Sequence, residues 1–106
     1  MMSDNFIKDL WDIIEKRQNA DSDHSWTAKL LQSDKEKIIQ KFGEESVEII
    51  IAAMANDKEE IIKESADVIY HLCVLWAKLG LTPQDIADEL VKRQQQSGIE
   101  EKKKRH

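Results

Sequence analysis

EEIIKESADVIYHLCVLWAKL, residues 59–79, is the stretch that decides the fold of this chain. It contains neither glycine nor proline. Asp57 with Glu60 predicts a cap at the start of a helix here, and Gly80 predicts its end. Across residues 68–79 such a helix is apolar on most of its circumference, which is more than one small domain buries by itself. The sequence therefore predicts a long helix that packs inside its own chain and against a second copy in a homodimer.

Helix-breaking residues are scarce in the rest of the chain, where Pro83 is the only proline. Apolar residues at helical spacing predict a first helix at about residues 4–17, and Ser25 opens a short segment, SWTAKLLQ. Ser33 and Glu36 match a Ser-x-x-Glu capping box, which predicts a long helix that runs to about residue 55.

The last predicted helix begins at Thr82 as its cap, with Pro83 at its first position, and fades near Gln96. Residues 97–106, SGIEEKKKRH, form a polar and basic tail. The prediction is one all-α domain over residues 1–106, a four- to five-helix bundle completed by homodimerisation.

Composition narrows the class of protein further. A chain of 106 residues suffices for one core without disulfides, and the lone Cys73 lies in an apolar run where a thiol behaves as a buried hydrophobe. No secretory leader and no stretch of membrane-spanning length are found, so we expect a cytoplasmic protein with no membrane partner. A formal net charge of −5 argues against a nucleic-acid partner, because binding a phosphate backbone needs a basic face.

Acidic residues form two stripes at helical spacing. In KFGEESVEII, residues 41–50, Glu44, Glu45 and Glu48 fall on one arc, with Lys41 one turn earlier. In the next helix the spacing of 4, 3 and 4 places a second polar stripe on one side, made of Glu60, Glu64, Asp67 and His71. Facing each other, the two stripes would form an acidic pocket that a hard divalent cation such as Mg²⁺ would neutralise. The chemistry implied is metal-assisted phosphoanhydride cleavage.

Each of these residues also has a plainer interpretation. One acidic cluster alone is usually a solvated helix face, and Glu60 is explained by helix capping. Structural hydrogen bonding and substrate contact are equally good explanations of His71. Lys41 is either a surface partner for Glu45 or a phosphate contact. The tryptophans Trp11, Trp26 and Trp76 are predicted to be core or interface anchors rather than stacking platforms.

Two motifs, GEESVE (43–48) and ESAD (64–67), resemble the Glu-Glu-x-x-Glu and Glu-x-x-Asp signature of the all-α nucleoside triphosphate pyrophosphohydrolases, the MazG-like superfamily. Three further segments resemble one family within it: SWTAKLL (25–31), KFGEE with YHLCVLW (70–76), and SGIEEK (97–102). In this order and spacing they are similar to the phosphoribosyl-ATP pyrophosphohydrolase family over nearly the whole chain.

This resemblance implies hydrolysis of phosphoribosyl-ATP to phosphoribosyl-AMP and diphosphate, the second step of histidine biosynthesis, with Mg²⁺ as cofactor. It implies Glu44 and Glu45 as catalytic residues, with Glu44 as an extra ligand or water-orienting base. The implied metal ligands are Glu45, Glu48, Glu64 and Asp67. The candidate substrate-binding residues are Lys29, Lys41, His71, Arg93, Lys102 and Arg105.

Two alternatives differ from this interpretation. The acidic signature equally permits a housecleaning pyrophosphohydrolase that acts on a deoxynucleoside triphosphate. A non-catalytic helical dimerisation module would carry the same stripes as solvated faces and bind no metal. The basic tail predicts a further contact: it would close over the ribose phosphate, which the metal does not neutralise.

Overall fold

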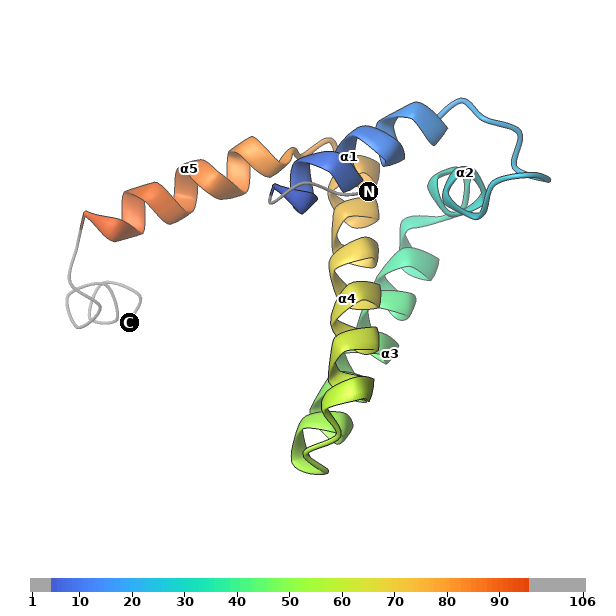
Figure 1. Ribbon diagram of the computed structural model, residues 1–106. Coiled ribbons are helices and arrows are strands. Elements are labelled where there is room, and N and C mark those ends of the chain that lie inside the picture. Colours follow the sequence, from blue (N-terminus) through green and yellow to red (C-terminus); the bar gives the residue numbers. More distant parts are fainter. Residues whose placement is uncertain (1–4, 96–106) are drawn as a thin grey trace.

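The computed structural model describes residues 5–95, and within them the chain forms five α-helices. They are α1 (Phe6–Arg17), α2 (Trp26–Gln32), α3 (Lys35–Met54), α4 (Lys58–Leu79) and α5 (Pro83–Gln94) (Figure 1). No strand occurs among residues 5–95, so the predicted all-α class is confirmed. No helix in this part of the chain is both long enough and apolar enough to cross a membrane.

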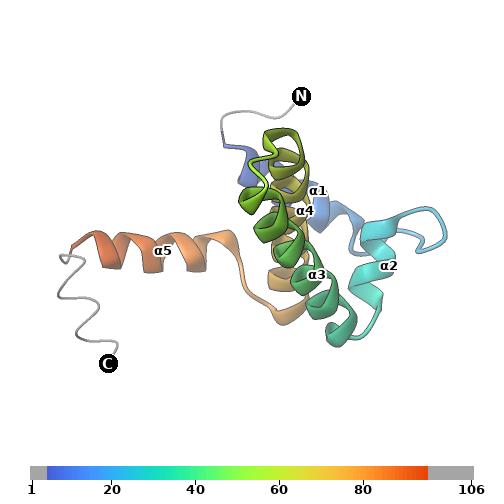
Figure 2. The same cartoon turned by 90° about the horizontal axis from the view of Figure 1, so that it is seen from below.

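The architecture is built on the antiparallel pair of α3 and α4, which pack along most of their length (Figure 1). The two are joined by the short turn of residues 55–57. Helices α1 and α2 also pack on α4, whereas α5 contacts α1 and projects outward from the rest of the described chain (Figure 2). The helical hairpin of α3 and α4 is therefore the element on which a site can be built.

The hydrophobic core lies where the first four helices meet. Its fully buried side chains are Ile14 of α1, Leu30 of α2, Ile38 of α3, and Cys73 and Val74 of α4. Each helix contributes residues from one face, as the helical spacing of apolar residues predicts. Cys73 is part of this core, as predicted, and α5 has no buried residue.

The helix ends agree with the sequence at most positions. The Asp57 carboxylate accepts a hydrogen bond from the Glu60 amide, and Gly80 ends α4 in the left-handed conformation with φ of 77°. Asn56 also has a positive φ, 55°, directly after the end of α3. Thr82 and Asp85 cap α5 reciprocally, with Pro83 in the first turn. Helix α5 ends at Gln94, two residues before the predicted end.

One predicted cap is wrong. Ser33 does not open α3: its hydroxyl donates to the Leu30 carbonyl at 2.6 Å, so it terminates α2 instead. The N-cap of α3 is Asp34, whose side chain makes no capping hydrogen bond. A serine in a two-residue gap between helices can accept from an amide of the following helix or donate to a carbonyl of the preceding one. Ser33 donates to the preceding helix.

Exposed apolar surface lies mainly on α3 rather than on α4. Val47, Ile50, Ile51 and Met54 are exposed on α3, and Met54 is 82% accessible. On α4, Leu72 and Leu75, which the predicted dimer face includes, are half-buried within the single chain. The tail of residues 97–106 lies outside the described residues.

Candidate metal centre

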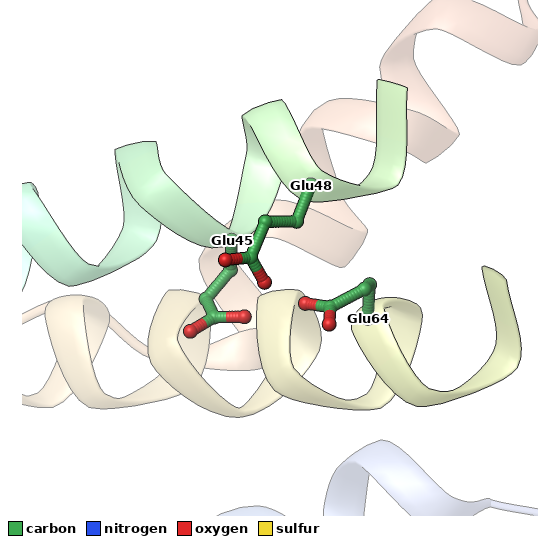
Figure 3. Close-up of side chains that lie close together, drawn as sticks. All are labelled: Glu45, Glu48 and Glu64. Carbon is green, nitrogen blue, oxygen red and sulfur yellow. The ribbon is translucent and has the colours of Figure 1, made fainter. Parts of the chain in front are cut away.

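Three glutamates from two helices converge on one point. Glu45 and Glu48 of α3 and Glu64 of α4 each offer a carboxylate oxygen, and these oxygens lie within 4.8 Å of one another (Figure 3). Glu45 and Glu48 are three residues apart and so project from the same side of α3. The antiparallel packing of α4 brings Glu64 opposite them, so one member of the α4 stripe lies close to two members of the α3 stripe.

The cluster borders a hollow of about 370 Å³ near the turn between α3 and α4. Apolar residues Ile51, Ala52 and Ala55 line one part of it, and Asp57 and Glu60 line another, together with Glu48 and Glu64. Ile51 and Ala52 follow Glu48 by three and four residues, so their position was accessible from helical spacing but was not predicted.

Glu60 takes part in the predicted helix cap and also borders the hollow. Its backbone amide is the group that is capped, by the Asp57 carboxylate at 3.2 Å, whereas its own side chain is among those that line the hollow. A second acidic side chain from α4 therefore borders the same space as Glu64. This increases the negative charge that faces any bound ligand.

Glu64 is the most perturbed residue of the cluster. Its side chain is buried, with 9% of the residue exposed. Hydrogen bonding to Glu45, burial, and the neighbouring Glu48 together raise the pKa of Glu64 from 4.5 to about 8. Its Oε2 atom is buried and has no hydrogen-bond partner among residues 5–95. An unsatisfied, buried carboxylate oxygen that faces two further carboxylates is an incomplete polar site.

These residues fit a hard divalent cation. All three donors are carboxylates, the ligand type that Mg²⁺ prefers, and a cation would satisfy the orphaned Oε2 atom. It would also stabilise the ionised form of Glu64, which the neighbouring carboxylates disfavour. Three ligands leave further coordination positions for water or for phosphate oxygens.

Two predicted members lie outside the cluster. Glu44 is exposed and its carboxylate accepts a hydrogen bond from the Gln40 side chain at 2.9 Å. Asp67 is also exposed, one turn beyond Glu64 on α4, and its carboxylate is not among those that converge. The roles predicted for both residues stay predictions.

His71 is held from one side only. It is buried, and its Nδ1 lies 2.9 Å from the Asp67 carbonyl oxygen. Because a carbonyl only accepts, Nδ1 carries a proton and donates it to this oxygen. Nε2 is buried and has no hydrogen-bond partner among residues 5–95. The structural interpretation explains Nδ1, and a role for Nε2 in substrate contact stays a prediction.

The predicted basic residues are widely spread. Lys41 is half-buried on α3, one turn before Glu45. Lys29 lies on α2 beside the ring of Trp26. Arg93 pairs with Glu89 on α5. Helix α5 follows the C-terminal end of α4, which lies about 22 Å along the helix axis from Glu64. Lys102 and Arg105 lie outside the described residues. Within one chain, Lys41 is the described candidate nearest to the cluster in sequence.

An all-α domain with an acidic cluster between two antiparallel helices has the architecture expected of the all-α pyrophosphohydrolase class, which the two acidic motifs resemble. The sequence model of one family, described as phosphoribosyl-ATP pyrophosphohydrolase, matches residues 7–94. The chain belongs to this family, as the sequence motifs predict.

Curated relatives cover nearly the same span. A protein of Paramagnetospirillum magneticum is 48% identical over 93% of this chain and 91% of its own length. One of Rhodospirillum rubrum is 50% identical over 85% of this chain and 77% of its own. One of Ruegeria pomeroyi is 48% identical over 91% of both chains. All three relatives are named phosphoribosyl-ATP pyrophosphatase.

Proposed function

We propose that this chain hydrolyses phosphoribosyl-ATP to phosphoribosyl-AMP and diphosphate, the second step of histidine biosynthesis, with Mg²⁺ bound at the Glu45, Glu48 and Glu64 cluster. The substrate and the class of enzyme follow from the family match and from the names of the relatives. The observation that carries the metal assignment is the convergence of three carboxylates, one of which, Glu64, has a buried oxygen without a hydrogen-bond partner among residues 5–95. Asp67, one turn from Glu64, is the fourth ligand implied by the family motif.

The two helices of the hairpin fix the positions of the three carboxylates. Glu45 and Glu48 are fixed on one helix and Glu64 on the other, so the rigid hairpin sets the geometry of the cluster. Glu64 must release its proton before it binds a cation, because its raised pKa keeps it partly protonated near neutral pH. When bound, Mg²⁺ supplies charge neutralisation at the triphosphate and lowers the pKa of a coordinated water.

Lys41 is suited to bind a phosphate oxygen of the substrate, and Glu44 is suited to orient the attacking water. Lys41 lies on the arc of α3 that carries the glutamates and is suited to pair with a phosphate oxygen of the substrate. Glu44 is suited to orient the attacking water, but its carboxylate must first leave its hydrogen bond with Gln40. A side chain that is exposed and held by one hydrogen bond between two surface residues makes this change at little cost.

The homodimer belongs to this proposal because apolar surface adjoins the site. Ile51 lines the hollow of the carboxylates and is 62% exposed, and Ile50 and Met54 next to it are also exposed. On the other side of the hairpin turn, Ile62 is 70% exposed. A second copy packed on this surface would bury the apolar residues and narrow the entrance to the metal site.

Turnover of several nucleotides tests the substrate assignment. We expect the purified protein to hydrolyse phosphoribosyl-ATP faster than ATP, dCTP or dUTP, with diphosphate as a product. Preference for a deoxynucleoside triphosphate would instead identify a housecleaning enzyme of the same superfamily. No feature of the described residues favours that alternative.

Calorimetry tests the metal site separately. Glu48→Gln replaces a charged ligand by a neutral one and is expected to weaken Mg²⁺ binding at least tenfold, which is about 1.4 kcal/mol. Glu15→Gln, an exposed change of the same kind on α1, is the matched control and leaves binding unchanged. Equal binding in both variants would place the ion away from Glu48, and no measurable binding in the parent chain would favour the non-catalytic dimerisation module.

Three further expectations stay predictions. Deletion of residues 101–106 is expected to raise KM for phosphoribosyl-ATP without loss of helicity, since the tail would contact the ribose phosphate. The cytoplasmic location and the absence of a nucleic-acid partner rest on the sequence alone.

A further inference from the structure

Trp26 is the exception among the three tryptophans. Trp11 and Trp76 are partly buried against the core, as predicted, whereas Trp26 at the start of α2 is 48% exposed. A large aromatic side chain with half of its surface in water gains little from burial. Its position therefore requires another explanation than core packing.

Two cations lie beside the exposed indole ring. The Nζ atoms of Lys29 and Lys37 are 6.0 and 5.8 Å from its centroid. Neither lysine forms a salt bridge with a carboxylate of residues 5–95, although Asp34 and Glu36 are close in sequence. An aromatic face flanked by two unpaired ammonium groups offers stacking and charge at one place.

Lys37, one of the two cations, lies on the same side of α3 as the metal centre. Lys37, Lys41 and Glu45 are spaced four residues apart, so they lie above one another on the side of the helix that carries the cluster. An open hollow of about 640 Å³ is lined by Lys37 and Lys41, and another of about 390 Å³ is lined by Trp26 and Lys29. From Lys37 to Glu48 the helix rises about 16 Å.

We propose that Trp26, Lys29 and Lys37 form the subsite for the part of the substrate remote from its triphosphate. This proposal rests on the proposed function. The substrate carries a purine between its triphosphate and a second ribose phosphate, so its two anionic ends lie on opposite sides of the base. The purine stacks on the indole of Trp26, and the ribose phosphate pairs with Lys29 and Lys37.

The purine can reach the indole face because the cation–π contacts of the two lysines with the ring are weak. A cation–π contact at an exposed site is weaker than the stacking of a base on an aromatic ring. A purine therefore displaces an ammonium group from the ring. The phosphate beyond the purine then accepts hydrogen bonds from that ammonium group. Plain ATP lacks that second phosphate, so the subsite would favour phosphoribosyl-ATP over ATP.

Indole fluorescence tests the subsite without metal or turnover. Phosphoribosyl-AMP, which retains the purine and the ribose phosphate, is titrated into the protein in the presence of a chelator. We expect quenching in the parent chain and none in Trp26→Phe, because the stacked and exposed reporter is then absent. Lys37→Gln should weaken the binding of phosphoribosyl-AMP roughly tenfold and leave that of AMP unchanged. Lys63→Gln, an exposed change on α4, is the matched control.

Steady-state kinetics give a second readout. Trp26→Leu and Lys37→Gln should each raise KM for phosphoribosyl-ATP roughly tenfold and change kcat less than twofold, since they act on binding. Binding of phosphoribosyl-AMP that neither Trp26→Phe nor Lys37→Gln alters would overturn the proposal. Metal-free binding through Trp26 in a protein that does not cleave phosphoribosyl-ATP would overturn the proposed function and leave the subsite standing. Circular dichroism checks that each variant is folded, and Lys37→Gln carries the test if the Trp26 variants are not.

Discussion

Glu64 couples protonation of the site to stability of the fold. Its pKa is about 8 in the folded chain against an ordinary 4.5, so the metal-free fold favours the protonated form. The stability that this preference contributes is fully present below about pH 4.5 and is lost as the pH rises through about 8. We therefore predict that the melting temperature of the metal-free protein falls over this window, and that it falls less in Glu64→Gln.

Magnesium should reverse this dependence. Because the cation binds the ionised carboxylate, its affinity is expected to rise with pH over the same window and to level off above about 8. Calorimetry at several pH values in two buffers of different ionisation enthalpy measures the proton released on binding. Parallel melting curves of the parent and Glu64→Gln would contradict the raised pKa.

Cys73 is predicted to be chemically silent in the native chain. Burial raises the pKa of its thiol to about 11, and the thiolate is the reactive form. Labelling by a thiol reagent should therefore be slow at neutral pH and should accelerate only when denaturant opens the core. Rapid labelling of the folded protein would show that Cys73 is not in the core described here.

Much of the site could be predicted from helical spacing. Three- and four-residue intervals predict the two acidic stripes that contain Glu45, Glu48 and Glu64, and the short turn after α3 brings the stripes together, whereas the choice of ligands within them comes from the family resemblance. The conformations of Glu44 and Asp67 were not accessible from spacing. Glu44 turns toward Gln40, and that choice depends on rotamers and local hydrogen bonds rather than on the helical repeat.

At the scale of the elements, the helix ends follow local chemistry. Gly80 and Asn56 have the backbone conformations that glycine and asparagine tolerate best, and both lie at the helix ends that the sequence indicates. The capping motif assigns Ser33 to the wrong helix because only two residues separate α2 and α3, and its hydroxyl donates to the Leu30 carbonyl of α2 instead of accepting from an amide of α3. A capping motif therefore indicates where two helices meet but does not show which of the two helices it caps.

Two glycines provide a matched test of these helix ends. Gly80 has φ of 77° and no atom within 4 Å of an added Cβ, so Gly80→Ala is expected to cost about 1 to 2 kcal/mol through backbone strain alone. Gly43 is an exposed residue inside α3 with equally free space. Gly43→Ala should stabilise the chain by about 0.5 to 1 kcal/mol. Denaturant unfolding of both variants measures the difference, and equal effects would contradict the assignment of Gly80 as the α4 cap.

At the scale of the molecule, the exposed apolar residues of α3 predict the dimer interface. Ile50 is 60% exposed in the single chain, so Ile50→Lys leaves the core intact while it introduces charge into the proposed interface. We expect a folded monomer, measured by sedimentation equilibrium with circular dichroism as the check on folding. Ile13→Lys, a change at an exposed residue of α1, is the control and should remain dimeric. A dimeric Ile50→Lys protein would place the interface elsewhere.

Helix α5 also favours the proposed homodimer. It contains no buried residue, and Leu90 and Val91 are exposed on it. An isolated helix of 12 residues is marginal in water even with good caps. Contacts from a second copy would therefore stabilise α5, and hydrogen exchange of its amides should slow as protein concentration rises.

The hairpin of α3 and α4 is also expected to fold before two chains associate. Helices that are adjacent in sequence make its largest interface, so contact order is low and the monomer is expected to fold within about microseconds to milliseconds. Association of two chains depends on concentration and is slower. All three glutamates of the cluster belong to the fast, local part. Under the proposed function, a newly made chain would hold all three glutamates in place before it meets a second copy, and we expect Mg²⁺ binding to be independent of protein concentration.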